Sequence, residues 1–293
     1  MALHYYAECL DCGYKAPFDI KHPACPKCGS LWREARYNYA ALAESFTGRV
    51  KGRPFDLWRY RELLPIQQMN SDLAMGEGGT PLIHARNLGM MLGLPHLYIK
   101  DERQGPTTSF KDRQAAVTIA CLKEAGITEM VCASTGNVAI SYSAYAARAG
   151  IKLWAFLTSL VPAIKMREVA IYGTQVVKIT GSYDLTKRLA DQFSKQRGLF
   201  LDLGARSIPC IESMKTIAFE IAEQVAAVLQ NDPAFQSRIS SSSWMAPDWY
   251  FQSVSGGLGP LGVSKGFREL ELMGLIQKQP KLGLVQAEGC APM

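Results

Sequence analysis

Four cysteines near the start of the chain are arranged as two Cys-x-x-Cys pairs. The first pair is Cys9 and Cys12, the second is Cys25 and Cys28, and a glycine directly follows each pair. This spacing is typical of two short turns that direct four thiolates at one tetrahedral Zn²⁺. The metal would be structural, because four sulfur ligands leave no open position for water. Two disulfides or four unligated thiols are the alternatives, and disulfides are disfavoured in a reducing compartment.

Lys111 is the second chemically marked position. It lies in the segment Ser-Phe-Lys-Asp-Arg, where Ser109 is the predicted N-cap of a helix that Gly126 ends. A lysine at the start of a helix and beside Phe110 faces the positive end of the helix dipole, so it loses its proton more easily. A neutral lysine amine is what Schiff-base formation with a carbonyl compound requires. The alternative is a solvated surface lysine, which is the commoner situation.

Two turns have the composition of anion-binding sites. Residues 134–137, Ser-Thr-Gly-Asn, offer hydroxyls and backbone N–H groups at the start of a predicted helix, where a carboxylate would be held. The same residue types are also ordinary helix caps. Residues 253–260 contain three glycines that let the backbone approach a phosphate, without the pattern of a nucleotide-binding loop. A reactive lysine, a carboxylate turn and a phosphate turn together describe a site for pyridoxal phosphate and an amino acid.

The elements that must position these residues alternate regularly after residue 128. Short apolar runs predict strands, and longer periodic segments that end at glycine predict helices. This alternation is typical of an α/β fold with parallel strands and helices on both faces, whose ligands bind where the strands end. Residues 237–248 are polar and are expected to form a surface loop. The predicted strands are 129–133, 152–157, 175–179, 199–203, 249–254 and 282–287, and the predicted helices are 138–148, 161–172, 184–197, 212–229 and 261–273.

The composition is that of an ordinary globular enzyme. Of 293 residues, 48% are hydrophobic and 20% are charged, which leaves room for two lobes. The net charge is +6, but no run of like charges indicates a nucleic-acid-binding surface. Neither a membrane span nor a signal peptide is recognisable, so a cytoplasmic location is expected.

Three domains are expected. Residues 1–32 would form a zinc-ribbon-like module, and residues 33–75 an irregular, aromatic-rich arm that packs on the main body. Residues 76–293 would form the catalytic domain, with a small lobe at roughly 105–180.

Longer segments make the sequence similar to one enzyme family. Four segments resemble the threonine synthase family, within the fold-type-II pyridoxal phosphate enzymes. They are Glu-Gly-Gly-Thr-Pro-Leu at 77–82, Ser-Phe-Lys-Asp-Arg at 109–113, Ala-Ser-Thr-Gly-Asn at 133–137 and the segment 212–224. The resemblance covers nearly the whole chain, including the N-terminal ribbon. It implies a fold like that of the tryptophan synthase β subunit, with parallel sheets and helices on both faces, plus the small zinc ribbon.

The resemblance also implies roles for individual residues. Lys111 matches the Schiff-base lysine, and Asn137 matches the asparagine that hydrogen-bonds the hydroxyl of the cofactor ring. Arg206 and Lys215 are candidate ligands of a substrate phosphate. The other matched residues are Ser134, Thr135 and Gly136 for the substrate carboxylate, and Ser255, Gly256, Gly257 and Gly259 for the cofactor phosphate.

The implied reaction converts O-phospho-L-homoserine and water to L-threonine and phosphate. The Lys111 amine would move protons at the α and β carbons while the cofactor ring holds the carbanion. The partner is then a small phosphorylated amino acid, with no nucleic acid and no membrane, and a homodimer is the candidate assembly.

Three features differ from the family pattern. The glycine loop lacks the asparagines that are usual there, and Thr108 stands where glycine is common. The chain stops at Met293, shortly after residues 286–289. The family continues there with the segment that carries the hydroxyl partner of the pyridine nitrogen, so a C-terminal truncation is expected.

Two other functions are compatible with the sequence. One is a related β-replacement enzyme such as cysteate synthase, which replaces the phosphate of phosphoserine with sulfite and which residues 204–206 and 248–257 resemble. The other is a zinc-ribbon binding protein whose enzyme body is catalytically inert.

Overall fold

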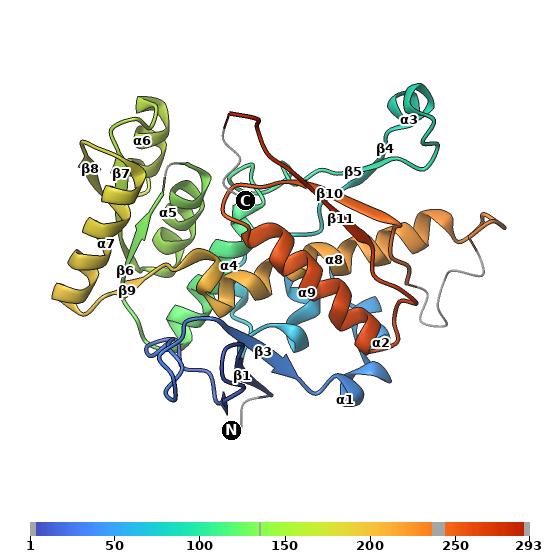
Figure 1. Cartoon of the computed structure of the whole chain (residues 1–293), viewed down its shortest axis with the longest axis horizontal. Coiled ribbons are helices and arrows are strands. Elements are labelled where there is room, and N and C mark those ends of the chain that lie inside the picture. Colours follow the sequence, from blue (N-terminus) through green and yellow to red (C-terminus); the bar gives the residue numbers. More distant parts are fainter. Residues whose placement is uncertain (1–3, 135, 236–243, 290–293) are drawn as a thin grey trace. The chain divides into compact units, whose positions relative to one another are not determined.

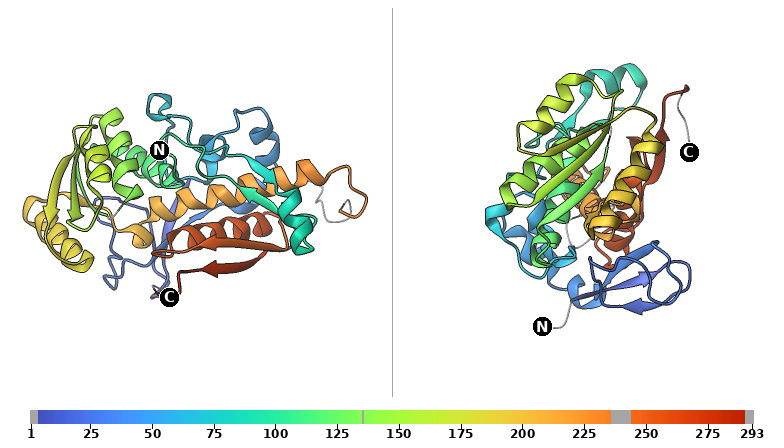
Figure 2. Two further views of the ribbon diagram at one scale, coloured as in Figure 1. Left: turned by 90° about the horizontal axis from the view of Figure 1, so that it is seen from above. Right: turned by 90° about the vertical axis from the view of Figure 1, so that its left-hand side faces the viewer.

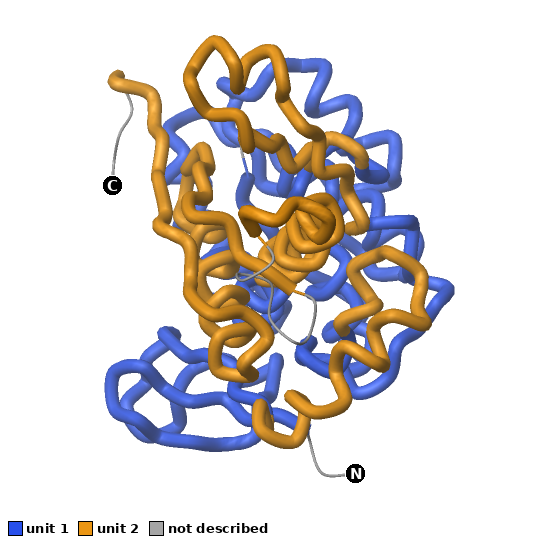
Figure 3. Tube along the Cα trace, turned by 90° about the vertical axis from the view of Figure 1, so that its right-hand side faces the viewer, with its two compact units in different colours: residues 1–37, 61–77, 105–213 blue, residues 38–60, 78–104, 214–293 orange. Residues whose placement is uncertain are grey.

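The computed structural model describes residues 4–134, 136–235 and 244–289. Thr135 and residues 237–243 of the predicted surface loop therefore lie outside the described residues. Among the helices that are described, none has the length and apolar character that a bilayer crossing requires. The domain boundaries expected from the sequence stay predictions. The chain divides into two compact units (Figure 3): unit 1 holds residues 1–37, 61–77 and 105–213, and unit 2 holds residues 38–60, 78–104 and 214–293.

The N-terminal part of unit 1 is a three-stranded antiparallel sheet in the order β2-β1-β3. Its strands are β1 (Tyr5–Cys9), β2 (Lys15–Ala16) and β3 (Arg33–Tyr37). Tyr5 lies opposite Tyr37 and Cys9 lies opposite Arg33, so the sheet continues past residue 32. The turns between these strands carry the remaining cysteines of the two predicted pairs.

The centre of unit 1 is a four-stranded parallel sheet in the order β8-β7-β6-β9. The strands predicted at 129–133 and 175–179 are confirmed to the residue. The strand predicted at 199–203 forms only at residues 200 and 201. Figure 1 shows α7 on one side of this sheet and α5 on the other, as expected for an α/β fold. The elements are β6 (Glu129–Ala133), β7 (Lys152–Thr158), β8 (Gln175–Ile179), β9 (Phe200–Leu201), α4 (Lys111–Glu124), α5 (Asn137–Ala149), α6 (Ala163–Ala170), α7 (Tyr183–Arg197), η2 (Ser71–Leu73) and η3 (Gly204–Arg206).

Unit 2 contains a second parallel pair of strands, β10 and β11, and Figure 2 shows α9 alongside it. A separate antiparallel pair, β4 and β5, flanks the short helix α3. Helix α8 (Ile208–Leu229) begins in unit 1, and its larger part belongs to unit 2. The other elements are α1 (Tyr39–Ala43), α2 (Phe46–Lys51), η1 (Leu57–Leu63), β4 (Leu82–His84), α3 (Arg86–Leu92), β5 (Tyr98–Lys100), β10 (Trp249–Ser253), α9 (Leu258–Leu272) and β11 (Lys281–Val285).

Residues 33–75 are more regular than the sequence analysis expects. They include α1, α2 and η1, and the aromatic side chains of Phe46 and Tyr60 belong to the core of unit 2. The ring centres of Tyr60 and Phe219 are 5.3 Å apart, and that of Phe46 lies 6.0 Å from Trp244. Edge-to-face contacts at these separations are favourable for aromatic rings. The helices escape prediction because they are short and their apolar periodicity spans little more than one turn.

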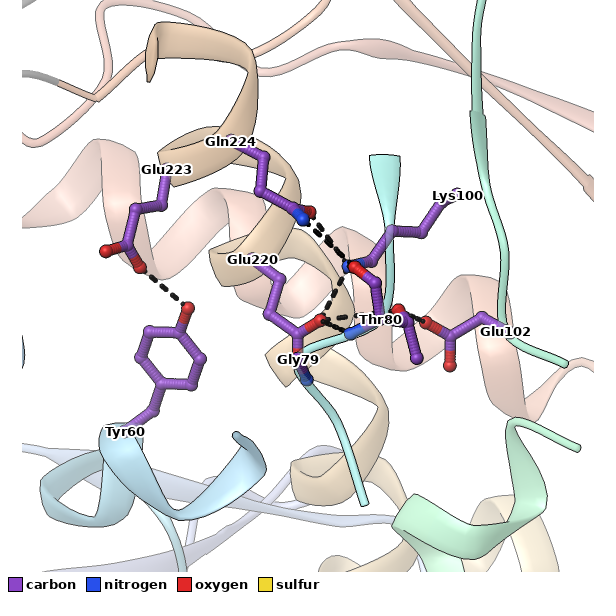
Figure 4. Close-up of polar contacts among 8 residues, drawn as sticks. All are labelled: Tyr60, Gly79, Thr80, Lys100, Glu102, Glu220, Glu223 and Gln224. Atoms are coloured by element: carbon purple, nitrogen blue, oxygen red, sulfur yellow. Dashed lines mark hydrogen bonds and ion pairs between the residues drawn. The ribbon is translucent and has the colours of Figure 1, made fainter. Parts of the chain in front are cut away.

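A buried carboxylate of unit 2 fixes the Glu-Gly-Gly-Thr-Pro-Leu segment (Figure 4). Glu220 is fully buried and accepts hydrogen bonds from the backbone N–H groups of Gly79 (2.9 Å) and Thr80 (3.2 Å) and from Nζ of Lys100 (2.6 Å). Gly79 has a φ of 60°, and a Cβ atom there would lie 1.8 Å from the carbonyl oxygen of Phe55. No side chain fits at this position, so the segment requires glycine for both conformation and space.

Gly79→Ala should therefore lower the free energy of unfolding by about 3 kcal/mol or more, because left-handed strain and a backbone clash add together. Gly76→Ala is the matched control. Gly76 also has a positive φ, 92°, but no atom lies within 4 Å of its added Cβ. The control should show only backbone strain, about 1–2 kcal/mol, in urea unfolding. Equal losses in the two variants would contradict the clash.

Candidate active site and candidate metal centre

Lys111 is the first residue of α4, at the helix start where the sequence predicts it. The N-cap is Phe110 rather than Ser109, which corrects the prediction by one residue. The Ser109 hydroxyl still lies at the helix start, where it accepts a hydrogen bond from the Lys111 backbone N–H (3.3 Å). Nζ of Lys111 lies 4.5 Å from the centre of the Phe110 ring. The amine is therefore held at the positive end of a helix of fourteen residues, in contact with an aromatic face.

Burial lowers the pKa of the Lys111 amine, and the Cys210 thiol and the Asp202 carboxyl offset only part of this shift. Burial in turn raises the pKa of Asp202, against hydrogen bonds from the Gly204 N–H (3.2 Å) and the Tyr142 hydroxyl (3.0 Å). A lysine in these surroundings holds more neutral amine at neutral pH than a surface lysine does. The sequence analysis missed Asp202, although its place directly after β9 marks the edge of the sheet where ligands bind.

The Ser-Thr-Gly-Asn turn lies between β6 and α5. The Ser134 hydroxyl accepts hydrogen bonds from the N–H groups of Gly136 (3.1 Å) and Ala139 (3.3 Å), so it stabilises the start of α5. Asn137 is the first residue of α5 and is exposed, and its Oδ1 accepts a hydrogen bond from Nζ of Lys165 (3.1 Å). Lys165 was not singled out from the sequence. It adds a positive charge beside a helix start, which favours an anionic ligand there.

Three loops leave the parallel sheet of unit 1 at the same edge. They follow β6, β7 and β9, whose carboxyl ends point in one direction because the strands are parallel. The first carries Ser134, the second leads into α6 with Lys165, and the third contains Arg206. Arg206 is exposed and ends η3. The edge thus bears two cations and the starts of α5 and α6, the features that recognise carboxylates and phosphates.

The glycine loop of unit 2 joins β10 to the start of α9. Gly257 is the N-cap of α9 and has a φ of 77°, which favours glycine. Ser255 and Gly256 are exposed, and no atom lies within 4 Å of a Cβ added to Gly256. A Cβ on Gly259 would come within 2.3 Å of the Gln252 amide. The loop therefore presents open backbone N–H groups at a helix start, which fits the phosphate of pyridoxal phosphate.

Lys215, the second candidate ligand of a substrate phosphate, is fully buried in unit 2. Its Nζ lies 2.8 Å from Glu269, which also pairs with Lys265 on the same helix. Burial raises the pKa of Glu269, but the two ammonium groups outweigh burial and lower it. The structure thus gives Lys215 an internal counter-ion, and its role in substrate binding stays a prediction.

The four predicted metal ligands converge in unit 1. The Sγ atoms of Cys9, Cys12, Cys25 and Cys28 all lie within 4.8 Å of one another. The Cys9–Cys28 and Cys12–Cys25 separations are 3.6 and 3.7 Å. Sulfur atoms bound tetrahedrally at about 2.3 Å from Zn²⁺ are about 3.8 Å apart, whereas a disulfide requires about 2.05 Å. The geometry and the donor set therefore fit a structural zinc centre rather than two disulfides.

Local backbone N–H groups favour the thiolate form of one cysteine of this cluster. Burial raises the pKa of the Cys25 thiol, but the backbone N–H groups of Cys28 and Lys27 outweigh burial and lower the pKa to about 6. Hydrogen bonds to the charged form favour the thiolate, which is the form that binds a metal.

Lys111→Met should raise the free energy of unfolding of the cofactor-free protein at pH 7. Below its lowered folded-state pKa the amine is charged in both states, so the folded chain bears the desolvation cost. This cost disappears as the pH rises toward about 10.4, where the unfolded lysine also loses its proton. The gain from Lys111→Met should therefore shrink between pH 7 and pH 10.5 in urea titrations. Lys195→Met, at an exposed lysine, is the control, and a gain independent of pH would contradict the lowered pKa.

Comparison with known proteins shows to which family the chain belongs. A family model described as pyridoxal-phosphate dependent enzyme matches residues 73–293. Threonine synthase from Methanocaldococcus jannaschii is 32% identical over 288 residues, which are 98% of this chain and 66% of that protein. Threonine synthase from Methanosarcina acetivorans is 30% identical over 290 residues, 99% of this chain and 66% of that protein. The chain thus spans about two thirds of the length of these relatives.

Solved structures share the fold. A pyridoxal 5'-phosphate-dependent aspartate racemase has a TM-score of 0.58 at 25% identity, over 72% of this chain and 58% of its own. Threonine deaminase isoform 2 from Solanum lycopersicum has a TM-score of 0.58 at 21% identity, over 86% of this chain and 61% of its own. These likenesses confirm the fold-type-II α/β architecture expected from the sequence, and the family match confirms the expected cofactor. The chain belongs to the family of pyridoxal-phosphate-dependent enzymes.

Proposed function

We propose that this protein is a threonine synthase, which converts O-phospho-L-homoserine and water to L-threonine and phosphate. The observation that carries the proposal is the buried amine of Lys111 at the start of α4, within a chain that matches proteins named threonine synthase over nearly its whole length. A cytoplasmic location and a homodimer stay predictions from the sequence.

Lys111 is proposed as the residue that holds the cofactor and moves protons. Its lowered pKa supplies neutral amine, which is the nucleophile that an aldehyde requires. The same amine would take and return protons at the α and β carbons of the substrate, because a lowered pKa leaves more of the amine unprotonated and able to act as a base. Bound pyridoxal phosphate supplies an electron sink for the negative charge at the α carbon.

The turn after β6 is proposed to orient the amino-acid substrate. Gly136, Ser134 and the first N–H groups of α5 would hold the substrate carboxylate, with Thr135 as the remaining predicted ligand. Asn137 would bind the hydroxyl of the cofactor ring. The hydrogen bond from Lys165 to Oδ1 of Asn137 supports this role, because it leaves the amide nitrogen as the donor.

The glycine loop after β10 is proposed to bind the cofactor phosphate. Ser255 and Gly256 are exposed and Gly257 adopts the left-handed conformation, so the backbone N–H groups and one hydroxyl can converge on an anion. Gly259 is the second residue of α9, and its missing side chain leaves space for Gln252 beside the loop. Arg206 is the proposed ligand of the substrate phosphate, since its exposed guanidinium lies in the loop after β9.

Borohydride reduction of the protein with pyridoxal phosphate should label Lys111, because only an imine is reduced to a stable linkage. Peptide mapping by mass spectrometry locates the label. Lys111→Ala should lose turnover by about 10²–10⁴-fold or more, while Lys123→Ala, at the other end of α4, should keep both turnover and the Lys111 label. A label on another lysine, or full turnover by Lys111→Ala, would refute the assigned role.

Phosphate release from O-phospho-L-homoserine, with threonine as the product, tests the substrate. Arg206→Ala should raise KM for this substrate by about tenfold or more, since a charged hydrogen bond to a phosphate contributes about 1.5–3 kcal/mol. The second assay uses O-phosphoserine and sulfite. Turnover in that assay alone would show that the protein is a cysteate synthase instead. Turnover in neither assay would favour the inert zinc-ribbon binding protein.

We also propose a structural Zn²⁺ at the four cysteines. Full-length protein should contain about one Zn²⁺ per chain by atomic emission. Cys28→Ser should lose this metal, whereas Cys132→Ala, at a cysteine in β6 far from the cluster in sequence, should keep it. Metal-free protein with two disulfides, shown by mass spectrometry without reduction, would overturn the zinc proposal.

A further inference from the structure

A buried arginine lies beside the candidate metal centre. Arg33 begins β3 and pairs with Cys9, the last residue of β1. Residues that face each other in an antiparallel pair place their side chains on the same side of the sheet, with Cβ atoms about 4.5–5.5 Å apart. Arg33 is only 4% exposed. Its cation is therefore held out of water on the side of the ribbon sheet that carries the Cys9 thiol.

The hydrogen bonds of Arg33 point to the second pair of cysteines. Its Nη1 donates to the carbonyl oxygens of Pro23 (3.3 Å) and Ala24 (3.4 Å), the two residues that precede Cys25. Its Nε and Nη2 are buried and have no hydrogen-bond partner in the described part of the chain. The guanidinium thus links β3 to the segment before Cys25, and two of its three nitrogens have no acceptor among the described residues.

Arg36, the other arginine of β3, differs from Arg33 because it has carboxylate partners. Arg36 points to the other side of β3 and is half-buried, and it pairs with Glu8 (2.8 Å) and Glu34 (2.9 Å). Arg33 has no carboxylate partner among the described residues. A buried cation without a counter-charge is strongly unfavourable, so the arrangement requires a negative charge that the protein groups around Arg33 do not provide.

The metal centre would provide this charge. Four thiolates around one Zn²⁺ leave a net negative charge that backbone N–H groups offset only in part. We propose that Arg33 is the counter-ion of the metal centre, where its guanidinium stabilises the metal-bound thiolates without being a ligand. The inference rests on the proposed zinc site and adds a residue that strengthens metal binding from outside the coordination sphere.

Zinc affinity of the full-length protein tests this role, measured by competition with a chromophoric chelator. Arg33→Gln, which keeps hydrogen-bond donors but removes the charge, should weaken affinity by about 10–100-fold, the range for partners outside the coordination sphere. Arg33→Lys keeps the charge and should retain most of the affinity. Arg36→Gln is the matched control on the opposite side of the strand and should leave affinity unchanged.

Hydrogen exchange separates a charge effect from loss of structure. If Arg33 acts through the metal-bound thiolates, the metal-free sheet does not depend on its charge. Amides of residues 5–9 and 33–37 in metal-free Arg33→Gln should therefore exchange no faster than in the metal-free wild type. Faster exchange would show that Arg33 only supports the backbone, which overturns the inference.

The other outcomes are equally decisive. Unchanged affinity in Arg33→Gln, or equal losses in Arg33→Gln and Arg36→Gln, would also overturn it. If Arg33→Gln does not fold, Arg33→Lys becomes the test. A loss of zinc affinity of about 10-fold in Arg33→Lys would then overturn the inference. A wild-type protein that binds no zinc at all would refute the metal site itself.

Discussion

A charged side chain that leaves water must find an opposite charge or give up its own, and this constraint organises both units of the protein. In unit 2, the carboxylate of Glu220 accepts hydrogen bonds from Lys100 and from the Gly79 turn, and Glu269 is shared by Lys215 and Lys265. These groups stay charged because their partners are close. Each of them fixes one segment of the chain to α8 or α9.

Lys111 responds to the loss of water by giving up its charge more easily. The groups around it do not fully compensate its charge, so burial lowers its pKa and the neutral amine becomes accessible. Lys215, in α8, is buried more deeply than Lys111 but has Glu269 as its counter-ion. The two lysines thus differ in how fully their neighbours compensate the positive charge. This difference is the physical basis for assigning the cofactor to Lys111.

The second organising feature is the direction of the parallel strands. Because β6, β7 and β9 run the same way, loops that are far apart in sequence end at one edge of the sheet of unit 1. That edge carries Ser134, Lys165 and Arg206, and the helix start of α5 adds its partial positive charge. In unit 2 the glycine loop occupies the corresponding place after β10. The proposed anion binding therefore depends on strand direction as much as on residue type.

The sequence by itself determined the features that depend on local pattern. Apolar runs bounded by glycine predicted β6 and β8 to the residue, the Cys-x-x-Cys spacing predicted the thiol cluster, and the cap residues placed Lys111 at a helix start. Only the tertiary structure decided which charges are buried and with what partners. Nothing near Lys215 in the sequence indicates Glu269, nothing near Arg33 indicates Cys9, and nothing near Asn137 indicates Lys165. Burial and pairing come from residues distant in the chain, so local periodicity carries no information about them.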